Sequence, residues 1–191
     1  MTGRKKISYY RLMHNESVSS EKIISSIQAN CLEGIVAGRH YLCIQDTSAI
    51  SYRHQKGKIK AGTLGWIAND AKDLGFFLHP TLVADAEQGI SQGFSHVHVW
   101  SRDQEAPNRY ERNYKKQSIE EKESWRWIES IQKSQQVLWQ AGHLPFIQVR
   151  EGDIYELFAQ ADERTDFIVR SRDNRRVANE DLKLFEYLQE Q

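Results

Sequence analysis

Asp46 is the side chain best placed to do chemistry in this sequence, because it lies at the end of a short stretch that begins with an apolar run. Residues 41–44 are rich in β-forming side chains and too few for a helix, so they predict an inner strand. An ionised carboxylate at the end of a buried strand needs a hydrogen-bond partner or a cation, since an unpaired buried charge is strongly unfavourable. Two interpretations of Asp46 remain open. It is a metal ligand, or it caps the following turn together with Thr47 and Ser48. Taken alone, this segment favours the turn cap.

His96 and His98 are a second candidate metal site, because they alternate along an apolar stretch and therefore lie on one face of a strand. The sequence offers no third ligand at a suitable spacing. A solvated or aromatic-packed strand face is therefore the favoured interpretation.

Four arginines near the end of the chain form its strongest basic patch: Arg170, Arg172, Arg175 and Arg176. Several arginines after an apolar strand fit contacts to nucleic-acid phosphates. Clusters of this kind are also common as solvated surface, and the patch alone favours that interpretation.

The elements that must position these residues begin with an amphipathic helix over residues 17–38, which leads into the Asp46 strand. Ser19 or Ser20 can cap its start and Gly38 can end it.

A hairpin and then alternating strands and helices are expected after Asp46. Residues 52–73 read as a long loop with a basic start, and residues 102–117 as an exposed excursion. A capping box at residues 118–121 predicts a helix of about six turns that ends near Gly142. Trp125 and Trp127 cannot both face the core from this one helix. Together the elements predict a mixed α/β sheet flanked by helices. The remaining expected elements are strands 75–84 and 93–100 as the hairpin, strand 144–149, helix 154–161, strand 166–170 and helix 180–191.

The composition fits one globular domain without a global electrostatic field. The chain has 191 residues, of which 39% are hydrophobic, and its 26 basic and 26 acidic residues cancel. A nucleic-acid-binding surface would therefore have to be local. Cys31 and Cys43 lack metal-ligand spacing and are expected to pack in the core of a cytoplasmic protein. No apolar run is long enough to predict a membrane-spanning helix. The basic N-terminus is not followed by the apolar segment that a signal peptide requires.

In the expected topology, the ends of the first and fourth strands lie side by side, so Asp46 faces the turn at residues 149–153. Adjacent strand ends are where a two-metal phosphoryl-transfer site can be built. Such a site needs two or three carboxylates to neutralise two divalent cations.

Several short segments, in order, resemble one family of bacterial enzymes. They are IQDTS at 44–48, SYRH at 51–54, GFFLHPTL at 75–82, VWSR at 99–102, IEEKESWRW at 119–127, REGDIY at 150–155 and FIVRSR at 167–172. These segments are similar to those of the insertion-sequence transposases of family four, the transposon-five-like DDE enzymes with a ribonuclease-H-like core. The resemblance runs from Arg11 to Val177.

The resemblance implies roles for individual residues. Asp46 matches the first of three catalytic acids, which bind Mg²⁺ in the family. Val149 stands at the second acid position and is a degenerate catalytic position, and the third acid lies beyond the end of this sequence. The candidates for DNA binding are Arg53, Arg150, Arg170 and Arg172.

The expected organisation is an incomplete, truncated transposase. Residues 1–39 correspond to an N-terminal linking helix region, 40–177 to a partial ribonuclease-H-like core, and 178–191 to a C-terminal helix. The resemblance implies that most of the family's domain for recognising DNA ends is absent from residues 1–39.

The missing acid leaves two candidate substitutes and several functional alternatives. Glu151 or Asp153 could replace it, but Asp153 is expected to cap the helix at Ile154, and Glu151 to partner Arg150.

The chain is therefore expected to be a transposase-family protein without catalytic activity. One alternative is a non-enzymatic fragment that binds transposon-end DNA or inhibits transposition, as a homodimer or paired with full-length transposase. Another is a degenerate reading frame without a selected function.

Overall fold

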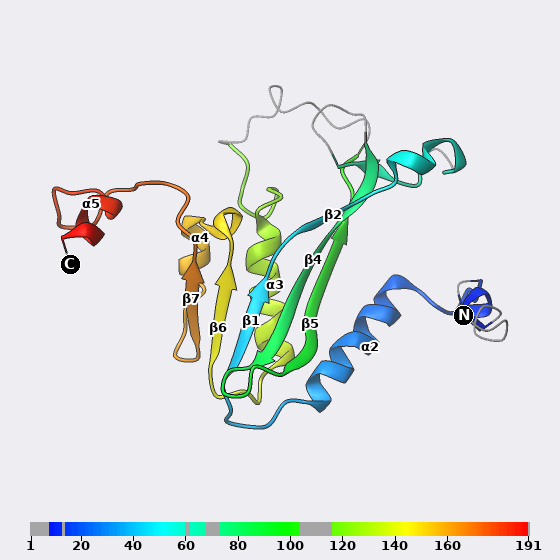
Figure 1. Ribbon diagram of the computed structural model, residues 1–191, viewed down its shortest axis with the longest axis horizontal. Helices are drawn as coiled ribbons and strands as arrows, with labels where there is room; N and C mark the ends of the chain where they lie inside the picture. Colours follow the sequence, from blue (N-terminus) through cyan, green and yellow to red (C-terminus); the bar gives the residue numbers. More distant parts are fainter. Residues whose placement is uncertain (1–7, 13, 60–61, 68–72, 104–115, 191) are drawn as a thin grey trace.

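The computed structural model describes residues 8–12, 14–59, 62–67, 73–103 and 116–190, and these form a mixed sheet flanked by helices (Figure 1). The described residues contain one seven-stranded sheet. Its strands are β1 (Tyr41–Gln45), β2 (Ser48–Ser51), β3 (Gly65–Trp66), β4 (Leu74–Asp85), β5 (Ser91–Trp100), β6 (Leu144–Gln148) and β7 (Thr165–Val169). The predicted α/β class and mixed sheet are confirmed.

The long strand β4 organises the antiparallel half of the sheet. It pairs with β5 along one edge as the predicted hairpin, and its second half pairs with β1 on the other edge. Its first half pairs with β2 and β3. The parallel half consists of β1, β6 and β7, so the strands run in the order β5-β4-β1-β6-β7 across the sheet.

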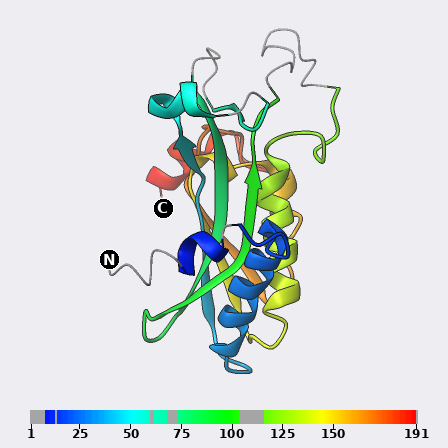
Figure 2. The ribbon, with the colours of Figure 1, turned by 90° about the vertical axis from the view of Figure 1, so that its right-hand side faces the viewer.

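Two helices, α2 (Ser20–Glu33) and α3 (Trp125–Val137), cover one face of the sheet (Figure 2). The core lies between them and β1, β4 and β6. Both free cysteines are buried there, as predicted from their spacing. The largest fully buried side chains of this core are Trp127, Tyr41, Phe146, Ile128, Ile131, Leu138 and Leu144.

The helix before β1 begins as predicted and ends earlier. Ser19 is its N-cap and accepts a hydrogen bond from the Lys22 backbone amide at 3.3 Å. The predicted end at Gly38 was wrong, because the helix stops at Glu33 and the chain turns before β1. Gly38 has φ +76° in that turn, a left-handed conformation that favours glycine.

The helix with the two tryptophans is shorter than the predicted six turns. Its 13 residues begin at Trp125, so the capping-box residues lie in a preceding turn, where the Ser118 amide donates to the Glu121 carboxylate at 3.2 Å. Trp127 is fully buried and Trp125 is partly buried, in agreement with the expectation that only one faces the core.

The elements nearer the C-terminus are also shorter than their patterns predicted. Helix α4 (Tyr155–Phe158) has four residues and α5 (Leu184–Gln189) has six, with no buried residue in α5. The apolar side of α5 therefore contributes little to the core. Gln191, the last residue of the predicted helix, lies outside the described residues.

The predicted loop after β2 contains a 3₁₀ helix, η1 (Arg53–Lys58), and the short strand β3. Residues 60–61 and 68–72 of this loop lie outside the described part of the chain, as do residues 104–115 of the predicted excursion. At the described ends of the excursion, Arg102 donates two hydrogen bonds to Glu123, at 2.6 and 2.8 Å. This paired contact ties the end of β5 to the start of α3.

The sheet face opposite α2 and α3 carries a row of apolar side chains that are partly open to solvent. Ile168, Ile147 and Ile44 are register neighbours across β7, β6 and β1. Ile168 is 59% exposed. Within the described residues, no helix is both long and apolar enough to cross a membrane.

Candidate functional site

Asp46 and Val149 follow the ends of two neighbouring parallel strands. The last register pair of β1 and β6 is Gln45 with Gln148, so the next residue of each strand emerges at the same edge of the sheet. The predicted juxtaposition of Asp46 and Val149 is therefore confirmed.

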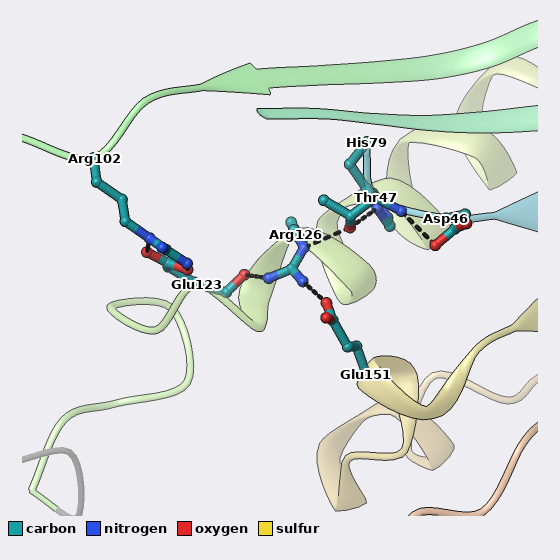
Figure 3. Close-up of polar contacts among 7 residues, drawn as sticks. All are labelled: Asp46, Thr47, His79, Arg102, Glu123, Arg126 and Glu151. Carbon is teal, nitrogen blue, oxygen red and sulfur yellow. Dashed lines mark hydrogen bonds and ion pairs between the residues drawn. The ribbon is translucent and has the colours of Figure 1, made fainter. Parts of the chain in front are cut away.

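The Asp46 carboxylate is exposed, so the expectation of a buried charge was wrong. One carboxylate oxygen accepts a hydrogen bond from the Thr47 amide at 2.7 Å, which is a local turn contact (Figure 3). Strand β1 buries the residues on either side of Ile44, but the chain emerges into solvent where the strand ends. A cation is therefore not needed to offset the burial of this carboxylate.

Arg126 is the centre of the polar network beside Asp46. Its guanidinium donates to the Thr47 hydroxyl at 3.1 Å, to the Glu123 carbonyl at 2.6 Å and to the Glu151 carboxylate at 2.5 Å (Figure 3). Its side chain is only 10% exposed, with its guanidinium carbon 5.3 Å from the ring centroid of Trp100. The network joins the end of β1, the start of α3 and the turn after β6.

Burial and the neighbouring carboxylate shift the pKa of Arg126 in opposite directions. Burial lowers the pKa of Arg126, whereas the carboxylate of Glu151 raises it. The guanidinium stays protonated at neutral pH because its ordinary pKa is so high. The sequence pattern predicted that one of Trp125 and Trp127 faces the core. It did not predict that Arg126, which lies between them, would be buried.

Both candidate substitutes for the missing acid are paired with arginines. Glu151 binds Arg126 rather than the expected Arg150. Asp153 is 4% exposed and accepts from the Arg172 amide at 2.7 Å and from the Arg175 guanidinium at 2.5 Å. It is not the N-cap of α4, a position that Ile154 holds without a side-chain hydrogen bond.

The set of side chains at this edge therefore does not fit a two-cation site. Val149 is 39% exposed and offers no lone pair. Asp46 is the one described carboxylate at these two strand ends that has no arginine partner. Two divalent cations need more carboxylates than this edge supplies.

His79 lies beside Thr47 and is held neutral by its surroundings. Burial lowers the pKa of His79 to about 3, and the positive charge of Arg126 acts in the same direction. The Thr47 hydroxyl lies 2.9 Å from His79 Nδ1. Because this hydroxyl accepts from Arg126, it can donate its proton to Nδ1 in the His79 tautomer that carries the ring proton on Nε2.

A buried row of amides supports the strand ends from within the sheet. The Gln148 amide donates to Gln45 at 2.5 Å, and the Gln45 amide donates to Thr81 at 3.0 Å. The row links β6, β1 and β4 one residue before Asp46 and Val149. Buried hydrogen bonds of this kind fix the relative position of the strand ends.

Three of the four predicted DNA-binding arginines gather near the ends of β6 and β7. Arg150 is exposed in the 3₁₀ turn η2 (Arg150–Gly152), and Arg170 is exposed immediately after β7, where its amide donates to the Gln148 carbonyl at 3.2 Å. Arg172 is exposed beside Asp173, with its Nε 2.9 Å from the carboxylate.

Arg53 is not part of this group. It starts η1, on the far side of the sheet end from β7 in Figure 1, and pairs with Asp73 at 3.5 Å. Arg175 is close to the group in sequence, but its charge is directed to the buried Asp153. Arg150, Arg170 and Arg172 are therefore the predicted DNA-binding residues that lie together at this edge.

The histidines of β5 do have a third candidate ligand, contrary to the expectation from the sequence. Glu129 of α3 lies 3.2 Å from His98, and the ligand atoms of His96, His98 and Glu129 are all within 4.8 Å of one another. Burial lowers the pKa of His96. Spacing along one strand could not reveal this glutamate, because it comes from a helix that folds over the strand.

The sequence matches no known protein-family model. The structure defines a mixed α/β protein with a buried arginine network and an arginine-bearing sheet edge. Among the described carboxylates at the ends of β1 and β6, only that of Asp46 has no arginine partner.

Proposed function

We propose that this chain is a transposase-family protein with a ribonuclease-H-like core that binds the DNA backbone without cleaving it. The observation that carries the proposal is that Asp46 and Val149 directly follow the last paired residues of the neighbouring strands β1 and β6. Three antiparallel strands followed by two parallel strands, with a carboxylate after the first, support descent from such a core.

The loss of cleavage follows from the ligand set. Hydrolysis at a phosphodiester by two divalent cations requires carboxylates that hold both ions and clamp the attacking and leaving oxygens. Val149 supplies none, and Glu151 and Asp153 already neutralise arginines. Recruiting either acid to a cation would leave a partly buried arginine without its partner, which is strongly unfavourable.

DNA binding rests on the exposed arginines at the same edge. Arg150 and Arg170 emerge from neighbouring strand ends, so one phosphate backbone can contact both. Contacts of this kind release counterions and read no base edges. Binding is therefore expected to be weak, insensitive to sequence and strongly dependent on salt.

A paired assay tests both parts of the proposal. Fluorescence anisotropy with several duplexes of unrelated sequence should give similar affinities that fall steeply as salt rises. The same duplexes incubated with Mg²⁺ or Mn²⁺ should remain intact. Metal-dependent cleavage that is abolished by Asp46→Ala would overturn the loss of catalysis, and a complete lack of binding at low salt would overturn the DNA-binding role.

A further inference from the structure

His96 and His98 of β5 converge with Glu129 of α3 on the helix-covered face of the sheet. His98 lies opposite His79 in the neighbouring strand, and directly opposed residues share a face. The His79 ring packs edge-on against Trp127 of α3, with centroids 4.4 Å apart, which identifies this face as the one under α3. The cluster therefore bridges a strand and a helix that only the fold brings together.

His96 is the side chain of this cluster that most clearly lacks a partner. It is 9% exposed, and within the described residues neither of its ring nitrogens has a hydrogen-bond partner. A buried imidazole with two unsatisfied nitrogens is unfavourable unless something binds it. His98 and Glu129, at 3.2 Å, already lie at the separation of two ligands on one cation.

We propose that His96, His98 and Glu129 bind a divalent transition-metal cation of the zinc class. Two imidazoles and one carboxylate form a ligand set that zinc accepts, whereas Mg²⁺ and Ca²⁺ prefer oxygen ligands. Ligand atoms around a tetrahedral zinc lie about 3.4 Å apart, given bonds near 2.1 Å. The ligand atoms of the cluster all lie within 4.8 Å of one another, so small side-chain movements bring them to that geometry.

The surroundings leave the carboxylate available to the cation. Arg126 precedes Glu129 on α3 but directs its guanidinium to Thr47 and Glu151. Lys133, one turn after Glu129, is exposed. A cation held by β5 and α3 would fasten the helix to the sheet and stabilise the folded state.

The test uses untagged protein dialysed against a chelator, with ZnCl₂ as the probe. Calorimetry should show one site, and the unfolding temperature should rise with zinc and not with MgCl₂. His98→Gln and Glu129→Gln, both at partly exposed side chains, should each weaken zinc binding at least tenfold and abolish the rise. Titration with CoCl₂ should give the strong visible absorption of a tetrahedral site, and the same two variants should lose it.

Two control variants separate this site from the other features of the protein. His143→Gln removes a histidine paired with Asp166 elsewhere in the fold, and Asp46→Asn removes the carboxylate at the strand end. Both should bind zinc like the original chain, whatever the outcome of the DNA assays. The proposal is overturned if the original chain binds no zinc, or if His98→Gln and Glu129→Gln bind it with unchanged affinity.

Discussion

Arg126 on α3 and Glu151 in the turn after β6 form an ion pair with a separation of 2.5 Å, directly beside the strand ends that carry Asp46 and Val149. The arginine is nearly buried, whereas the glutamate is largely exposed. The pair therefore fastens the helix to the turn and removes a carboxylate from the edge where a cation would bind.

Replacing Arg126 by Met should lower the free energy of unfolding by roughly 1–3 kcal/mol, because several charge-assisted hydrogen bonds disappear. Glu151→Gln should have a smaller effect, because this side chain is exposed and an amide can still accept a hydrogen bond. Urea denaturation of both variants measures the difference. Equal decreases, or none in the Arg126 variant, would contradict the central role of the guanidinium.

Val149→Asp should place a second carboxylate beside Asp46 and increase Mn²⁺ affinity at this edge. Val149→Asn, which has a similar shape and no charge, should not. Cleavage of duplex DNA should stay undetectable in both, since Glu151 and Asp153 remain paired with arginines. Mn²⁺ titration followed by electron paramagnetic resonance checks the binding. Cleavage by the Asp variant would show that two carboxylates suffice here.

The double variant Arg170→Ala/Arg172→Ala should weaken binding to all duplexes alike. The slope of log affinity against log salt should flatten by roughly one unit for each phosphate interaction removed. Lys22→Ala is the control, because it removes a positive charge from a different part of the protein. Lys22 lies on α2, where its ammonium group donates a hydrogen bond to the Ser17 carbonyl. Anisotropy titrations at several salt concentrations give the slopes. Unchanged affinity in the double variant would identify these arginines as ordinary surface.

His79 should make the folded protein less stable in acid. Its pKa is about 3 in the folded protein, below the ordinary value of 6.5, so the unfolded chain binds a proton first as the pH falls. This contribution to stability is complete above pH 6.5 and is lost progressively between 6.5 and 3. His79→Gln should therefore reduce the decline in stability over this range, whereas His40→Gln, at an exposed site, should not. Denaturation at a series of pH values in the presence of a chelator measures both slopes, and parallel slopes for all three proteins would contradict the prediction.

Ile168→Thr should raise solubility with little loss of stability. The side chain is largely exposed in the apolar row, and threonine keeps the β-branched shape that a strand favours. Phe146→Thr, at a fully buried position, is the contrasting variant and should be strongly destabilised. Light scattering at increasing concentration, together with thermal unfolding, distinguishes the two effects. A large fall in the unfolding temperature of the Ile168 variant would mean that this face is covered.

The main strands, the hairpin and the neighbouring ends of β1 and β6 could be predicted from the sequence. Short apolar runs bounded by turn residues predicted β1, the β4–β5 hairpin, β6 and β7, and this order brought Asp46 next to Val149. Local patterns sufficed because strand periodicity and turn chemistry are properties of neighbouring residues. The helix lengths were less predictable, since the apolar spacing around α2 and α3 continues into turns that also face the core.

The pairing of charges, in contrast, depends on how distant segments pack. Glu151 could have joined Arg150 or a cation, but α3 brings the guanidinium of Arg126 to it from 25 residues away. Asp153 resembled a helix cap, yet the chain after β7 folds back and provides Arg175. Glu129 likewise reaches His98 only because α3 packs over β5. No local spacing in the sequence encodes these contacts, because each one forms only when separate elements come together in the folded chain.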